Sequence, residues 1–140
     1  MTSGLLRPGS DRLGALTSDE ALVSAMVDVE SAWLAVLGLP SDLEVPDAAA
    51  LSTYLERAGN PVVPLLDALR DDAPAQLHKG LTSQDTLDTA LLLMAQTVRR
   101  RVIADAEVLC AELARLAADH RGSLMVGRTL TQTAVPITFG

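Results

Sequence analysis

Aromatic residues are scarce in this chain, which has one Trp, one Tyr and one Phe among its 140 residues. Strands favour aromatic and β-branched side chains, whereas helices favour the Leu and Ala that are abundant here. The composition therefore predicts an all-α protein. Hydrophobic residues make up 49% of the chain, which is enough to form the core of one domain of this length.

Cysteine, positive charge and long apolar runs are also scarce. The single Cys110 excludes an internal disulfide and a cysteine-rich metal site, and it suits a reducing compartment. The net charge of −7 argues against a nucleic-acid or anionic-membrane partner, because either would require a concentrated basic surface. The most apolar stretch, residues 90–95, is too short to cross a bilayer. We therefore expect a cytoplasmic protein with no nucleic-acid or membrane partner.

Gly and Pro divide the first half of the chain into helices. Residues 1–16 contain Gly and Pro without a sustained hydrophobic period, which predicts an extended arm. Thr17 and Glu20 have the spacing of a capping box, so a helix should begin at Thr17 and stop at Gly38.

Two shorter helices are expected next. Pro46 is suited to the first position of a helix that ends at Gly59. A third helix should begin after Pro61 and end near residues 71–72, before Pro74.

Residues 83–120 contain neither Pro nor Gly and keep a helical period, which predicts one helix about 55 Å long. Such a helix suits a bundle of long helices, and its fully apolar part, residues 90–95, suggests cover by neighbouring subunits. The tail should form an extended turn around Gly127, with Pro136 opening another helix. We therefore expect an arm (1–16), an N-terminal helical domain (17–82) and the start of a central helical bundle (83–140).

Residues 78–85, HKGLTSQD, form the first candidate site. An imidazole, His78, and two hydroxyls, Thr82 and Ser83, gather just before the N-terminus of the long helix, where backbone N–H groups and the helix dipole attract anions. A ligand with a carboxylate would fit there. The alternative interpretation is that Thr82 or Ser83 is an N-cap, Asp85 interacts with the dipole and His78 is an ordinary loop residue.

Residues 127–136, GRTLTQTAVP, form the second candidate site. Arg128 offers a planar fork suited to a carboxylate, and Thr129 and Gln132 offer neutral hydrogen bonds. The alternative interpretation is an exposed turn with an ordinary surface Arg.

Four segments in this order resemble the opening of the fumarase/aspartase superfamily: MVDVESAW at 26–33, GNPVVPLL at 59–66, HKGLTSQDTLDTALLL at 78–93 and GRTLTQTAVPITFG at 127–140. Leu130 stands where fumarases, adenylosuccinate lyases and argininosuccinate lyases usually carry a His. An apolar residue at this position resembles the pattern of the bacterial 3-carboxy-cis,cis-muconate cycloisomerases. Lys79 stands where many relatives have an aromatic residue, so the fine shape of that pocket departs from the family pattern.

The resemblance implies a cycloisomerase that interconverts 3-carboxy-cis,cis-muconate and 4-carboxymuconolactone in protocatechuate degradation, with no metal or redox cofactor. The small-molecule substrate would be a tricarboxylate. His78 would contact the substrate or orient the site, with Gln84 and Asp85 in support. Substrate would be bound by Thr82, Ser83, Arg128, Thr129 and Gln132, the last three from another subunit.

The resemblance also implies a homotetramer with active sites shared between subunits. The family's acid/base serine lies in a segment reading approximately Gly-Ser-Ser-x-Met-Pro-x-Lys, and that segment does not occur in this sequence. We therefore expect the 140-residue chain alone to be an inactive fragment. Two alternatives stay open: an adenylosuccinate-lyase-like enzyme, which Leu130 disfavours, and a non-catalytic helical oligomerisation module.

Overall fold

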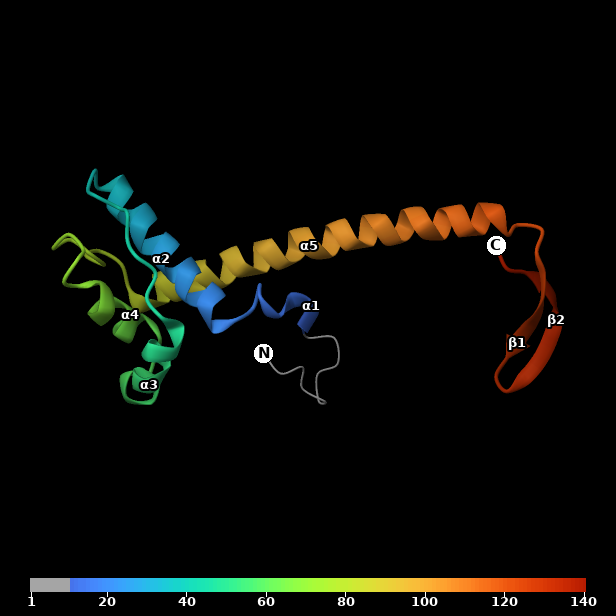
Figure 1. Cartoon of the computed structure of the whole chain (residues 1–140), viewed down its shortest axis with the longest axis horizontal. Coiled ribbons are helices and arrows are strands. Elements are labelled where there is room, and N and C mark those ends of the chain that lie inside the picture. The colour runs from blue at the N-terminus through green and yellow to red at the C-terminus, as the bar shows by residue number, and fades with distance from the viewer. Residues whose placement is uncertain (1–10) are drawn as a thin grey trace. The chain divides into compact units, whose positions relative to one another are not determined.

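A computed structural model describes residues 11–140 of the chain (Figure 1). In the described part the elements are α1 (Asp11–Gly14), α2 (Asp19–Val36), α3 (Ala48–Ala58), α4 (Val62–Leu69), α5 (Ser83–Asp119), β1 (Leu124–Thr129) and β2 (Gln132–Thr138). The chain divides into two compact units, one that ends at Arg99 and one that covers residues 100–140. The predicted helical fold is confirmed, and a small hairpin is added to it. Residues 1–10 of the arm predicted over residues 1–16 lie outside the described residues, and residues 11–14 form α1, so the extended conformation expected there was wrong.

The start of α2 differs from the sequence prediction. Ser18, in extended backbone conformation, is the N-cap, and its hydroxyl accepts a hydrogen bond from the Ala21 N–H at 3.3 Å. The Thr17 hydroxyl instead donates to the carbonyl of Leu13 at 3.2 Å and belongs to the preceding turn. Helix α2 therefore begins at Asp19, after the N-cap Ser18, and the predicted start at Thr17 was wrong. A side-chain hydrogen bond with Ser18 holds the pKa of Glu20 below its ordinary value.

Helices α3 and α4 are also capped by side chains. The Asp47 carboxylate accepts from the Ala49 N–H at 3.2 Å, so α3 begins at Ala48 and the expectation that Pro46 opens it was wrong. The predicted stop at Gly59 is confirmed, because this residue ends α3 with a φ of 77° that glycine adopts without strain. The Asn60 side-chain oxygen accepts from two N–H groups at the start of α4.

The hydrophobic core of the first unit lies between α2, α3, α4 and the start of α5. Met26, Leu34, Val62 and Leu65 are fully buried within it. Met26 and Leu34 come from α2 and the other two from α4, so burying them fixes how these two helices pack within this unit. The further buried hydrophobic residues of the core are Val23, Ala25, Val27, Ala48, Leu69 and Ala90.

Helix α5 confirms the predicted long helix. In its first turns Thr86 and Ala90 are fully buried, whereas Leu91, Leu92 and Leu93 are 48%, 71% and 40% exposed in the single chain. The apolar stretch therefore has only one covered side within its own unit. None of the helices in residues 11–140 combines the length and apolarity needed to span a membrane.

The second unit ends in the β1–β2 hairpin, in which Thr129 pairs with Gln132 across a two-residue turn. Pro136 lies in β2 opposite Val126, so the expectation that it opens a helix was wrong. A two-stranded ribbon has two edges, and an edge position tolerates the missing N–H of proline. Gly127 lies at an irregularity in β1, where an added Cβ would meet the carbonyl oxygen of Val135 at 2.6 Å.

Candidate functional site

The N-terminus of α5 is held by three hydrogen bonds between Thr82 and Asp85, which donate to each other. The Thr82 N–H and hydroxyl donate to the Asp85 carboxylate at 2.7 and 2.8 Å, and the Asp85 N–H donates to the Thr82 hydroxyl at 3.2 Å. These contacts, the backbone one first, hold the pKa of the Asp85 carboxyl below its ordinary value. Capping therefore occupies the Thr82 hydroxyl, while the neighbouring Ser83 is half-buried and Gln84 is exposed.

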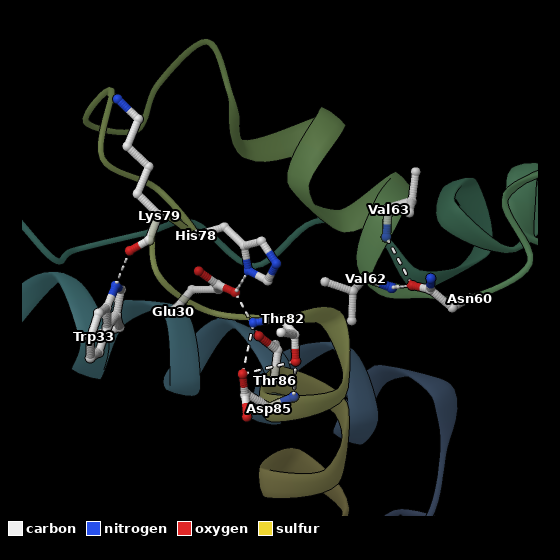
Figure 2. Close-up of polar contacts among 10 residues, drawn as sticks. All are labelled: Glu30, Trp33, Asn60, Val62, Val63, His78, Lys79, Thr82, Asp85 and Thr86. Atoms are coloured by element: carbon white, nitrogen blue, oxygen red, sulfur yellow. Dashed lines mark hydrogen bonds and ion pairs between the residues drawn. The ribbon is translucent and has the colours of Figure 1, made fainter.

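His78 lies in the loop before this helix start, and its ring contacts a carboxylate from α2 (Figure 2). Its Nδ1 is 2.7 Å from Oε1 of Glu30, and the Thr86 hydroxyl donates to the same oxygen at 2.8 Å. The Glu30 side chain is fully buried and that of His78 is 19% exposed. The His78 backbone has a φ of 59°, a conformation that non-glycine residues adopt rarely. His78 is thus held in place and is not a loosely placed loop residue.

Trp33, one helical turn after Glu30 on α2, holds the next part of the same loop. Its indole Nε1–H donates to the carbonyl of Lys79 at 2.9 Å (Figure 2). Gly80 has a φ of 93°, and a Cβ on it would lie 3.2 Å from the Trp33 ring. The loop therefore approaches α2 so closely that only glycine fits at residue 80 without strain.

Neither Glu30 nor Thr86 was predicted from the sequence to be a site residue. A signal for Glu30 was present, because it lies four residues from both Met26 and Leu34 on a helix face that is otherwise apolar. A carboxylate on a buried face needs a partner, since burying an unpaired charge is costly. Its partner is His78, 48 residues away, and such a pairing cannot be deduced from spacing.

A cavity of about 340 Å³ lies beside His78. Two cationic side chains, Arg70 and Lys79, are among its lining residues, and both are exposed. Arg70 also forms an ion pair with Asp67 at 3.1 Å, so among the described residues Lys79 is the lining cation for which no ion pair is seen, and its charge suits an anionic ligand. The remaining lining residues are Leu66, Pro74, Ala75 and Leu77.

The second candidate segment lies on the hairpin of the other unit. Arg128 and Thr129 end β1, Gln132 begins β2, and all three are exposed. Leu130, in the turn between the strands, is 91% exposed, and the next residue has a positive φ of 61°. The hairpin thus brings Arg128, Thr129 and Gln132 together at one end of a two-stranded ribbon.

The described residues, 11–140, contain no group of three or more His, Cys, Asp or Glu side chains placed to hold a metal ion.

A family model, curated proteins and a solved structure that resemble this chain all point to the same family. A protein-family model described as "Lyase" matches residues 45–140. The chain is 39% identical to nitrosuccinate lyase of Streptomyces davaonensis and 31% identical to 3-carboxy-cis,cis-muconate cycloisomerase of Pseudomonas putida, covering 99% and 88% of this chain. The crystal structure of a fumarate lyase from Mesorhizobium sp. BNC1 matches 92% of this chain with a TM-score of 0.77 and 30% identity.

The chain covers 34% of each of these three proteins, and so spans about a third of their length. The family model covers well over half of the chain, and the matched range includes both candidate segments. The chain therefore belongs to the lyase family of the fumarase/aspartase superfamily.

Proposed function

We propose that this chain is part of an enzyme that makes or breaks a bond at the carbon β to a carboxylate of a small polycarboxylic acid. The observation that carries the proposal is His78, held by Glu30 beside a cavity whose lining includes Arg70 and Lys79. Reactions of this type place negative charge on a carboxylate as an enediolate, and backbone N–H groups, hydroxyls and cations stabilise such charge.

The first candidate reaction is the cycloisomerisation of 3-carboxy-cis,cis-muconate. One carboxylate adds across a double bond to form the C–O bond of 4-carboxymuconolactone, and a proton is delivered to the adjacent carbon. Identity of 31% to the Pseudomonas putida cycloisomerase and the apolar Leu130 support this candidate.

The second candidate is elimination from nitrosuccinate, supported by 39% identity over 99% of the chain to nitrosuccinate lyase. A proton leaves the carbon next to one carboxylate while the C–N bond on the neighbouring carbon breaks. Nitrite and an unsaturated four-carbon dicarboxylate are the products. Both candidates need carboxylate recognition and proton transfer, and they differ in the bond that changes.

The structure refines which side chains we assign to the substrate. Thr82 has one hydroxyl proton and donates it to Asp85, so Ser83 is the better hydroxyl donor at the start of α5. We also assign Arg128, Thr129 and Gln132 to substrate binding, contributed by another subunit of a homotetramer. The exposed leucines 91–93 would be covered in that assembly.

Purified intact protein that contains this chain should be offered both substrates. Loss of the conjugated muconate absorbance identifies the cycloisomerase, release of nitrite identifies the lyase, and turnover of neither refutes the proposal. H78N should lower kcat/KM by about 100-fold or more if His78 takes part in proton transfer. H120N is the matched control, because His120 is the second histidine of the chain and lies outside the site. If H78N had the same kcat/KM as H120N, the assignment of His78 to the site would be wrong.

A further inference from the structure

Glu30 is a buried carboxylate whose presence packing does not explain. Its side chain has no exposed surface, and it shares a face of α2 with the fully buried Met26 and Leu34. Within the described residues its Oε2 has no hydrogen-bond partner. A leucine of similar volume would fill this position without leaving a buried polar oxygen unpaired. The carboxylate must therefore be accounted for by what its other oxygen contacts.

That other oxygen, Oε1, contacts the side chains of His78 and Thr86, which both follow α4 in the sequence. The His78 ring nitrogen Nδ1 lies 2.7 Å away and the Thr86 hydroxyl donates at 2.8 Å (Figure 2). Oε1 already accepts a hydrogen bond from the Thr86 hydroxyl, and a carboxyl oxygen that carries no proton can only accept, so a hydrogen bond with His78 requires the proton on Nδ1. In a neutral imidazole the other nitrogen, Nε2, is then unprotonated and acts as an acceptor.

The loop backbone that carries the His78 ring is also held against α2. His78 is in the left-handed region at φ 59°, and the following carbonyl, that of Lys79, is fixed by the Trp33 indole at 2.9 Å. Glu30 and Trp33 are three residues apart on α2 and therefore lie on the same side of the helix. One face of α2 thus fixes both the side chain of residue 78 and the backbone of residue 79.

We propose that Glu30 is a positioning residue that holds His78 in the Nδ1–H form and presents Nε2 to the ligand. The part of this inference that concerns a substrate rests on the proposed function. The part that concerns the tautomer does not, and it is measured without activity. Thr86 shares the task, because its hydroxyl holds the same carboxylate oxygen.

Long-range proton–nitrogen correlation spectra of the 140-residue chain report which ring nitrogen carries the proton. Spectra are recorded at a pH alkaline enough for the rings to hold a single proton. The variants are E30L, which removes the acceptor, and E30Q, which keeps an oxygen acceptor without the charge. D28N removes an exposed carboxylate from the same helix and is the matched control. His120 provides an internal reference, because its Nδ1 contacts Ser123 and not Glu30.

In the wild type and in D28N the His78 ring should be in the Nδ1–H form. In E30L most of the population should change to the Nε2–H form. In E30Q the Nδ1 proton should resonate further upfield, because a neutral oxygen is a weaker acceptor than a carboxylate. His120 should be unchanged throughout. The proposal is overturned if the wild-type ring is the Nε2–H form or if folded E30L keeps Nδ1–H. Should E30L lose its helical circular dichroism, the wild-type tautomer and E30Q decide, and an unmoved Nδ1 proton in E30Q overturns the proposal.

Activity of the intact protein supplies a second, separate readout. E30L should lower kcat by about 10–100-fold, the scale measured when a group that orients a metal-binding histidine is removed. KM should change much less, because Glu30 does not touch the substrate. If neither candidate substrate is turned over, the proposed function fails while the tautomer result stands. If the wild-type enzyme is active but E30L leaves kcat unchanged, the positioning role fails and the function stands.

Discussion

Replacing Gly80 by Ala tests how closely the loop of residues 78–80 packs against α2. Gly80 has a φ of 93°, a left-handed conformation that costs an L residue about 1–2 kcal/mol. The added Cβ would also lie 3.2 Å from Cζ2 of Trp33, and overpacking of this kind costs about 1–3 kcal/mol. We therefore expect G80A to lose about 2–5 kcal/mol of unfolding free energy. Urea denaturation of the 140-residue chain, followed by far-UV circular dichroism, measures this loss.

Gly59 supplies the matched control. Its φ of 77° is also left-handed, but a Cβ there would meet nothing within 4 Å, so G59A should lose only the conformational part. Combining G80A with W33F, whose ring is smaller, should recover much of the steric part in a double-mutant cycle. If G80A and G59A lost the same free energy, the close approach of residue 80 to Trp33 would carry no energy and the reasoning would be refuted.

Three further predictions concern other parts of the chain. G127A should open the hairpin, because its Cβ would meet the carbonyl oxygen of Val135 at 2.6 Å; loss of amide-exchange protection in β1 and β2 would reveal this, and unchanged protection would contradict it. In urea denaturation of the monomeric 140-residue chain, L65A, at a fully buried position, should cost about 2–5 kcal/mol, whereas L92A, at a position 71% exposed in the single chain, should stay within about 0.5 kcal/mol of wild type. The lowered pKa of Asp85 means that its ionised form stabilises the fold above the ordinary pKa of 3.8 and that this stabilisation is lost as pH falls through the lowered value. Thermal melts of wild type and D85N should therefore differ at neutral pH and converge in strong acid, and a constant difference would argue against this assignment.

The helices could be predicted from sequence because their signals are local. Helix α3 ends at Gly59 as expected, α2 ends at Val36 just before Gly38, and the absence of Pro and Gly from residues 83–120 indicated the full extent of α5. The errors at the helix starts were also local. Thr17 and Pro46 each lie beside a residue, Ser18 or Asp47, whose side chain reaches the first free N–H groups more directly.

The candidate site could be predicted only in part. Residues 78–85 were recognised by their chemistry and by their resemblance to a family, and the structure places them at the start of α5 as expected. Glu30 contacts the His78 ring and Trp33 holds the carbonyl of Lys79, whereas a sequence pattern alone assigns both α2 residues to a helix face. The hairpin was missed because Pro136 is compatible with both a helix start and an edge strand, and only pairing with β1 decides between them.

The long-range contacts between α2 and residues 78–86 also have a consequence for folding. Contacts that join residues 46, 48 and 56 positions apart form only when the first unit has reached its native packing, whereas each helix gains its hydrogen bonds locally. A compact intermediate with full helix content would therefore still lack an ordered site. Because Trp33 is the single tryptophan of the chain and its indole bonds the loop, its emission reports when the loop docks. Refolding followed by this signal and by circular dichroism would separate helix formation from assembly of the site.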